Sequence, residues 1–423
     1  MRARFDGLWR HPDFVRLWAG ETISVFGSLV GGVALGFTAV VYLDARPFQV
    51  ALVTSSNTLA GVCVSLFAGV WVDRLHRRPI MIAADIGRAA ALTSIPVAAV
   101  FGVLRVEQLY AVGLLTGAMT TFFDVAYQSY LPTLVQEEEL VEGNSKLTAS
   151  ASVAEFGAFS IAGWLVQLLT GPGAIVVDAV SFLFSAGAVR AIRTRESARP
   201  PAAQRQGIRV EIAEGIRTIA HDRVLRALAA SAISLQLASG MVGAVYLLFA
   251  SRELGFSPGV LGMIFGIGGV TSLVGALLAG WAARRFGTGG AMILGLAIAG
   301  VGVFIVAGAR GPTLLSAALL ISNQLITDGA WTIYEINAIS LRQSITPERL
   351  LGRVNAAVRF GGLLAMLAGA LVAGIVAETI GPRVVLLIGG CVISSDALWI
   401  VLSPARSRSY DQAGVQPPTF KPS

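Results

Sequence analysis

The stretch Gly69-Val-Trp-Val-Asp73-Arg74-Leu-His-Arg77-Arg78-Pro79 places one acid, three arginines and a histidine between two long apolar runs. The chain around it has 423 residues, of which 55% are hydrophobic and only 13% are charged. A soluble domain carries about 25% charged residues, and a single hydrophobic core stops growing beyond roughly 250–300 residues. This much apolar surface therefore predicts a membrane protein, with the charged stretch as a link outside the lipid.

The apolar runs have the length of membrane-spanning helices. About 20 helical residues cross a hydrocarbon core of about 30 Å. Barrel strands would alternate apolar and polar residues, which runs such as 296–306 do not do. The sequence predicts twelve spans, at about 17–43, 50–72, 79–104, 109–134, 147–170, 174–192, 225–249, 258–282, 289–309, 314–340, 355–379 and 383–403.

Arginine placement predicts the orientation of these spans. If the N-terminus is cytoplasmic, the outside loops hold only Arg46, Arg105, Arg252, Arg310 and Arg383, and the other loops hold far more basic residues. Cytoplasmic loops of membrane proteins carry an excess of Lys and Arg. Both termini and the 69–79 stretch are therefore expected in the cytoplasm. The basic residues are dispersed among many loops, so no nucleic-acid partner is expected.

The chain divides near its middle. Residues 193–224 contain a polar, Pro-containing linker followed by an amphipathic stretch, with six spans on either side. Gly280-Trp-Ala-Ala-Arg284-Arg285 after span eight weakly repeats the stretch after span two. We expect an N-terminal six-helix bundle (1–192), a cytoplasmic linker (193–224), a C-terminal six-helix bundle (225–403) and a cytoplasmic tail (404–423). Two such pseudo-symmetric halves are the plan of a transporter built from repeats.

Three stretches carry a family resemblance. Residues 69–78 resemble the loop 2–3 signature of the major facilitator superfamily, and this likeness covers nearly the whole chain. Residues 122–135 (Phe122-Phe-Asp-Val-Ala-Tyr-Gln-Ser-Tyr-Leu-Pro-Thr-Leu-Val) resemble the fourth span of its drug-exporter branch, which includes macrolide and siderophore exporters. Residues 340–355 resemble that branch's loop 10–11. Val125 and Glu21 depart from the proline and glutamine frequent in the branch, and these departures concern substrate selection rather than the fold.

The resemblance implies a gating role for the charged link, which would latch the two halves together when the protein faces outward. The alternative for Arg77 and Arg78 is that they only anchor the loop in the cytoplasm. Asp85 and Arg88, three residues apart on one helix face, neutralise each other or join the latch. The candidate gating residues are Gly69, Asp73, Arg74, Arg77, Arg78, Asp85 and Arg88.

Acids within the spans are candidates for coupling or substrate binding, because charges inside a membrane usually face a cavity or a partner. Asp124 and Asp328 lie near the middle of spans four and ten, which the resemblance places beside a central cavity. Two carboxylates there would bind a cationic substrate or carry protons. The alternative is that each is a buried acid hydrogen-bonded to neighbouring helices.

Polar and aromatic residues surround Asp328 in the sequence. Aromatic groups with a few polar ones suit bulky amphiphiles, although an aromatic stripe at helical spacing also serves helix packing. Glu21, near the cytoplasmic end of span one, and Gln128, a weaker candidate in span four, complete the set. The candidate cavity residues are Glu21, Asp124, Gln128, Asp328, Trp331, Tyr334 and Glu335.

The sequence lacks several catalytic motifs. It has no Gly-x-x-x-x-Gly-Lys-Ser/Thr phosphate loop, no His-Glu-x-x-His zinc motif and no Gly-x-Ser-x-Gly elbow. No cofactor and no metal are expected, and an ion gradient is the expected energy source, with protons favoured over sodium.

Together these observations favour a secondary active transporter of the inner or plasma membrane, not an enzyme. We expect a proton-coupled exporter of amphiphilic small molecules (drug, siderophore or metabolite) that works by alternating access as a monomer in the lipid bilayer. The alternatives are a facilitative uniporter or importer of a small metabolite and, less favoured, a membrane-embedded enzyme.

Overall fold

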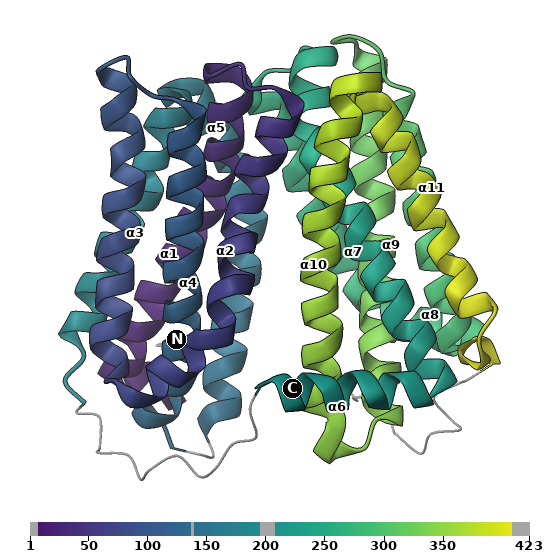
Figure 1. Cartoon of the computed structure of the whole chain (residues 1–423), viewed down its shortest axis with the longest axis horizontal. Coiled ribbons are helices and arrows are strands. Elements are labelled where there is room, and N and C mark those ends of the chain that lie inside the picture. Colours follow the sequence, from purple (N-terminus) through teal and green to yellow (C-terminus); the bar gives the residue numbers. More distant parts are fainter. Residues whose placement is uncertain (1–6, 137–138, 195–207, 408–423) are drawn as a thin grey trace, which may run out of the picture. The chain divides into compact units, whose positions relative to one another are not determined.

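The structure is a computed structural model that describes residues 7–136, 139–194 and 208–407, except for some side chains inside α2, α5, α6 and α10. Over these residues the chain is helical and contains no strand (Figure 1). The α-helices are α1 (Pro12–Phe37), α2 (Pro47–Arg74), α3 (Arg77–Val100), α4 (Val106–Leu134), α5 (Leu140–Ala191), α6 (Ile208–His221), α7 (Arg223–Leu248), α8 (Pro258–Ala307), α9 (Leu314–Ile345), α10 (Glu348–Ile380) and α11 (Pro382–Val401).

Two of these helices are kinked pairs. In α5 the backbone leaves helical geometry at Thr170 (φ 67°, ψ 168°), and in α8 it does so at Gly287 (φ 76°, ψ 158°). Glycine adopts positive φ without steric penalty, and Thr170 is followed by Gly171 and Pro172, which favour a turn. Both breaks lie at or near predicted span boundaries. With each kinked helix counted as two and α6 set aside, the described chain has twelve helices, which confirms the predicted all-α fold.

Nine helical stretches of the described chain are long and apolar enough to cross a membrane. The kinked α8 counts once among them, and α5 counts only from Gly157 onward. The helix α9 is absent from this set because of its polar residues, which include Asn323, Gln324, Asp328 and Glu335. The difference from twelve therefore comes from the two kinks and from one unusually polar helix.

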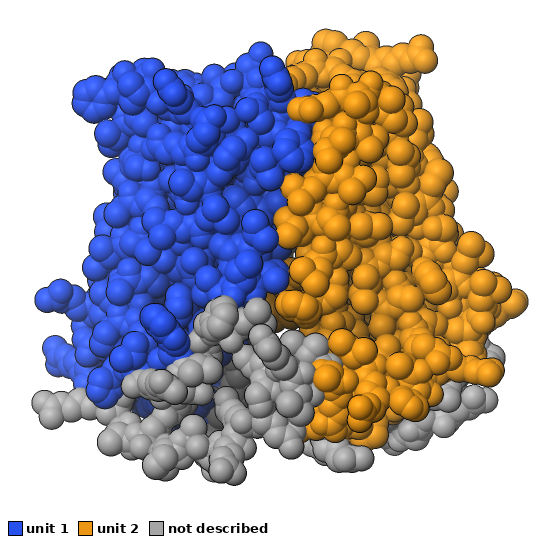
Figure 2. All heavy atoms as spheres, viewed as in Figure 1, with its two compact units in different colours: residues 1–205, 257–266 blue, residues 206–256, 267–423 orange. Residues whose placement is uncertain are grey.

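The chain forms two compact units, coloured separately in Figure 2. Unit 1 comprises residues 1–205 and 257–266, and unit 2 comprises residues 206–256 and 267–423. The first turns of α8 thus belong to unit 1. There the backbone N–H of Gly259 donates to Gln167 Oε1 at 3.0 Å, and Gly262 packs directly on Gly163.

The first membrane helix of each unit ends in the same irregular way. A five-residue π-helical turn follows α1 (Thr38–Tyr42), and another follows α7 (Phe249–Glu253). Leu43 N–H donates to the Thr38 carbonyl at 2.9 Å, and Leu254 N–H donates to the Phe249 carbonyl at 3.1 Å. This shared backbone pattern reveals a repeat between the halves that residue identities barely show.

Each unit has its own apolar core. In unit 1 the core includes Leu8, Phe14, Met81, Phe123 and Tyr130. Gly27 and Gly31 of α1 lie against Ser181 and Asp178 of α5, because small residues allow close helix approach in lipid. In unit 2 the core includes Leu228, Leu235, Met292, Leu296 and Ile393.

Candidate functional site

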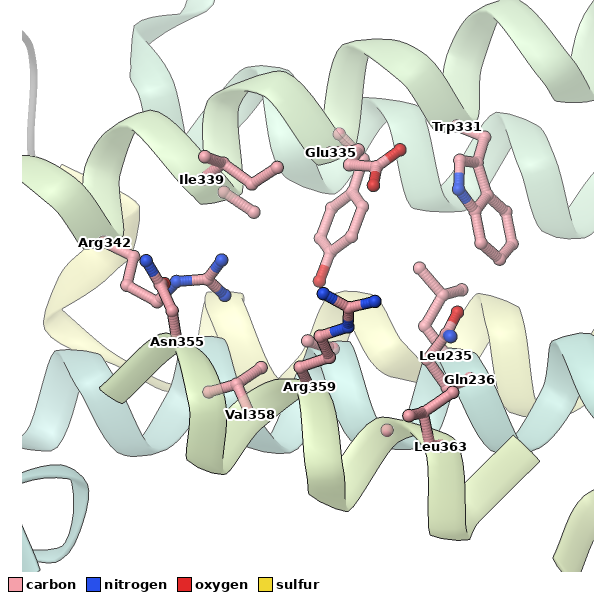
Figure 3. A pocket seen from close by; sticks show the side chains of 14 residues that line it. Leu235, Gln236, Trp331, Glu335, Ile339, Arg342, Asn355, Val358, Arg359 and Leu363 are labelled. Atoms are coloured by element: carbon pink, nitrogen blue, oxygen red, sulfur yellow. The ribbon is translucent and has the colours of Figure 1, made fainter. Parts of the chain in front are cut away.

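A pocket lies inside unit 2, between α7, α9 and α10 (Figure 3). Its volume is about 290 Å³. The α9 wall carries Trp331, Glu335, Ala338 and Arg342, at spacings that place them on one helix face. The α10 wall carries Asn355, Val358, Arg359, Gly362 and Leu363, and α7 contributes Ala232, Leu235 and Gln236.

Two arginines face this pocket without forming an ion pair with any described acid, although Arg342 interacts electrostatically with Glu335. Figure 3 shows the side chains of Arg342 and Arg359 directed into the space between α9 and α10. In the described part of the chain no ion pair within 4.0 Å joins either arginine to an acid, Glu335 included. With two arginines and one glutamate, the pocket carries a formal charge of +1.

Some polar groups of the pocket residues have hydrogen-bond partners, and others have none among the described residues. The Tyr334 hydroxyl is buried and shares a hydrogen bond of 2.8 Å with Ser231 Oγ of α7, so this tyrosine links two helices. Arg342 Nε and Asn355 Oδ1 are buried atoms without a hydrogen-bond partner in the described structure. Buried polar atoms almost always have a partner, so these two atoms are exceptions beside the pocket.

Asp328 lies beside this pocket but is not part of its wall. It is half-buried on α9, three residues before Trp331, and its carboxylate packs against Gly268 of α8. A Cβ atom at residue 268 would collide with Asp328 Oδ2. The glycine therefore makes room for the acid.

In unit 1 the main charged pair is Asp85 with Arg88, both on α3. Their side chains are 0% and 4% exposed and form an ion pair. The Arg88 guanidinium lies 4.5 Å from the Phe123 ring centre and 4.0 Å from that of Phe182. Arg88 Nη1 also donates to Thr120 Oγ1 at 3.2 Å. This pair sits in the interior of unit 1 rather than in the charged link.

The remaining unit 1 candidates lie around this pair. Glu21 of α1 has one buried carboxylate oxygen, Oε2, without a hydrogen-bond partner, and it interacts electrostatically with Asp124, Asp85 and Arg88. Asp124 and Gln128 are exposed and one turn apart on α4. Glu21, Asp85 and Asp178 of α5 thus all interact electrostatically with Arg88.

The charged link is compact. The helix α2 ends at Arg74, and α3 begins at Arg77. Arg77 is buried, and Arg78 donates from Nε to the Val189 carbonyl at 3.2 Å and from its terminal nitrogen to the Arg190 carbonyl. These carbonyls lie in the last turn of α5, where the Val189 carbonyl also accepts from Ile192 N–H at 3.2 Å. The side chains of Gly69, Asp73 and Arg74 lie outside the described residues, so the latch stays a prediction.

The structure thus brings three of the predicted cavity residues, Trp331, Tyr334 and Glu335, together in one pocket of unit 2. Glu21, Asp124 and Gln128 belong to unit 1 and do not line this pocket. Sequence reasoning missed Arg342, Asn355 and Arg359 as pocket residues. The sequence feature that could have revealed Asn355 and Arg359 is their four-residue spacing, which places both on the same helix face.

Comparison with known sequences identifies the class of protein. The sequence profile of the Major Facilitator Superfamily matches residues 17–364 and, in a second alignment, residues 228–421. The chain therefore belongs to the major facilitator superfamily and is a multi-span membrane transporter. The predicted family is confirmed.

Among similar proteins is the uncharacterized MFS-type transporter YfiS of Bacillus subtilis, 25% identical over 408 residues, which are 93% of this chain and 94% of that protein. The multidrug efflux pump Tap of Mycolicibacterium fortuitum is 26% identical over 219 residues, 48% of this chain and 53% of its own. Macrolide efflux protein A of Streptococcus pyogenes is 25% identical over 183 residues, 43% of this chain and 44% of its own.

Solved structures share the fold. A bacterial homologue of the iron transporter ferroportin, in an inward-facing state, has a TM-score of 0.77 and 17% identity over 95% of this chain and 100% of that one. The nucleoside transporter NupG has a TM-score of 0.76 and 14% identity over 92% of this chain and 98% of its own. At these identities the likeness concerns the fold alone.

Proposed function

We propose that this transporter is a proton-coupled exporter of amphiphilic small molecules. The observation that carries the proposal is the polar face of α9, which places ionisable groups and Trp331 at a pocket within a helical membrane bundle. Ionisable residues inside membrane segments typically mark substrate or proton pathways. The partial matches to a multidrug efflux pump and a macrolide efflux protein favour export.

In this proposal the parts of the molecule have separate tasks. The two six-helix bundles, residues 1–192 and 225–403, alternate between inward-facing and outward-facing arrangements, and residues 193–224 link them on the cytoplasmic side. Asp328 and Asp124 carry protons, and Trp331, Tyr334 and Glu335 contact the substrate. Residues 69–78 latch the bundles in one arrangement. Both termini lie in the cytoplasm of a monomer in the cell membrane.

The test is transport in inside-out membrane vesicles from cells that express the protein. The panel contains radiolabelled erythromycin, ethidium and naphthylacetate, and vesicles without the protein are the control. We expect accumulation of one or more compounds when a pH gradient is imposed, and its loss when a protonophore collapses that gradient. Accumulation that survives the protonophore would contradict proton coupling, and protein-dependent entry that only equilibrates the compound would indicate a uniporter. No protein-dependent movement of any compound would contradict the proposal as a whole.

A further inference from the structure

The pocket of unit 2 has a charge opposite to that expected for a carrier of cationic drugs. Its walls hold Arg342, Arg359 and a single acid, Glu335. An isolated organic cation would meet two guanidinium groups there. The acids in the predicted spans favour a cationic substrate, but the folded helices bring Arg342 and Arg359 to the pocket.

From this arrangement we infer that the protein recognises amphiphilic organic anions, with an acidic headgroup held by Arg342 and Arg359 and an apolar or aromatic body against Trp331. This inference rests on the proposed transport function and names the substrate class of the same pocket. A headgroup of this kind is a carboxylate, a sulfonate or a phosphate.

The chemistry and surroundings of the pocket arginines favour an anionic ligand. A guanidinium presents its N–H donors in a planar fork that matches the oxygens of a carboxylate or phosphate. Arg342 lines the pocket, is only partly buried and forms no ion pair within 4.0 Å in the described structure, so its terminal N–H groups can donate to a ligand. Hydrogen bonds between a guanidinium and an anionic oxygen are stronger than those between neutral groups, which favours an anion at this position.

The positions of the other pocket residues fit the two ends of such a molecule. Arg342 and Asn355 lie at one end of the pocket in Figure 3, and Trp331 lies at the other, with Arg359 and Glu335 between them. Leu235, Val358 and Leu363 add apolar surface to the walls. The ligand therefore needs a charged end near Arg342 and an apolar end near Trp331 and Leu363.

Tyr334 holds the α9 wall of the pocket in place. Its hydroxyl bonds Ser231 at 2.8 Å, and its side chain is buried between α7 and α9. The α9 wall that carries Trp331, Glu335 and Arg342 is thus fastened to α7 before any ligand arrives. Preorganised sites lose less affinity to ordering on binding.

The experiment measures binding by the full-length protein in lipid nanodiscs, using calorimetry with protein-free nanodiscs as background. Three probes share one aromatic body: naphthylacetate (anion), naphthylethanol (neutral) and naphthylethylamine (cation). We expect the anion to bind at least about tenfold tighter than the other two, because hydrogen bonds between charged groups are stronger than neutral ones. Tenfold corresponds to about 1.4 kcal/mol.

Variants then locate the effect. Arg342→Gln and Arg359→Gln are each expected to remove most of the preference for the anion and to leave naphthylethanol binding unchanged, and Arg342→Lys retains part of the preference. Arg217→Gln, at an exposed arginine of α6 in the same unit, is the matched control and binds as the unmodified protein does.

Two results would overturn the inference: an anion that binds no tighter than the neutral or cationic probe, or an arginine variant that weakens all three probes equally. The comparison among probes on the unmodified protein remains decisive even if a variant fails to fold. Absence of transport in vesicles with retained anion preference would reject the proposed transport function and leave the ligand class standing.

Discussion

Arg88 of unit 1 and Arg342 of unit 2 are both arginines within a helical bundle, but their surroundings differ. Arg88 has an acid on its own helix, the Thr120 hydroxyl and two phenylalanine rings as neighbours. Arg342 lines a pocket and has no acidic partner within 4.0 Å in the described structure. The difference teaches that one buried arginine stabilises its own bundle, whereas the other has interactions left for a ligand.

The balance of acids and arginines also differs between the two units. In unit 1, Glu21, Asp85 and Asp178 interact with one arginine, Arg88, whereas the pocket of unit 2 has one glutamate and two arginines. Asp328 stands apart in unit 2, packed against Gly268 rather than lining that pocket. This arrangement separates a candidate proton carrier from a candidate anion site on the same helix, α9.

The largest effect is expected from Asp328→Asn, which removes the ionisable group but keeps the side-chain volume. We expect complete loss of accumulation driven by a pH gradient in inside-out vesicles, with the amount of protein in the membrane unchanged. Glu253→Gln, at an exposed acid of the same unit, is the control and transports normally. Normal export by well-expressed Asp328→Asn would remove that residue from the mechanism.

The second prediction concerns the folding role of the unit 1 pair. Arg88→Gln leaves Asp85 buried without its counter-charge, and breaking a buried pair typically costs about 3–5 kcal/mol of stability. Thermal unfolding of the purified protein, followed by size exclusion, should show a large decrease in Tm. The double variant Asp85→Asn with Arg88→Gln should recover much of it, because Asp85 no longer leaves an uncompensated charge. A single variant as stable as the parent would show that the pair is not structural.

The third prediction tests the contact between Gly268 and Asp328. Gly268→Ala introduces a Cβ where the Asp328 carboxylate lies, and overpacking typically costs about 1–3 kcal/mol. We expect lower thermal stability together with slower transport, because the acid must move. Gly243→Ala, at a helical glycine of α7 whose Cβ would meet no atom within 4 Å, is the matched control and loses no stability. Equal behaviour of the two variants would contradict this contact.

The smallest effect is expected from a change at Glu142, whose side chain contacts Leu8 near the start of the chain. Glu142 accepts a hydrogen bond from Lys146, with 2.6 Å between the charged atoms, and another from Leu8 N–H, and these contacts lower the pKa of Glu142. A lowered folded-state pKa stabilises the fold above the ordinary glutamate pKa of about 4.3, and this contribution disappears as the pH falls through the lowered value. Glu142→Gln should therefore reduce Tm slightly at pH 7 and have no effect near pH 3. A larger effect of the substitution at pH 3 than at pH 7 would contradict this sign.

Most of the fold could be predicted from the sequence, because lipid imposes a simple length and apolarity rule on each span. The break near Thr170 follows from its glycine and proline neighbours. The π-helical turns after α1 and α7 could not be foreseen, because they depend on backbone bonding that no residue type demands.

The pocket was harder to predict than the fold. Arg342 lies close to the end of a span, where a basic residue also satisfies the orientation rule, so it was counted as a topology signal. Arg359 falls inside a predicted span, where its sequence neighbours do not distinguish a pocket residue from one that only packs between helices. The three-residue spacing of Asp85 and Arg88 predicts that they neutralise each other or join the latch, and only the rings of Phe123 and Phe182 around Arg88 reveal the interior position of the pair.

The most direct test of the contrast between the two arginines measures Tm with and without naphthylacetate, because a ligand that binds only the folded state raises Tm. We predict that Arg88→Gln has a much lower Tm but still gains stability from the ligand, whereas Arg342→Gln has nearly the parent Tm and gains none. The opposite pattern, with Arg342→Gln strongly destabilised and Arg88→Gln insensitive to the ligand, would contradict the assignment of one arginine to folding and the other to ligand binding.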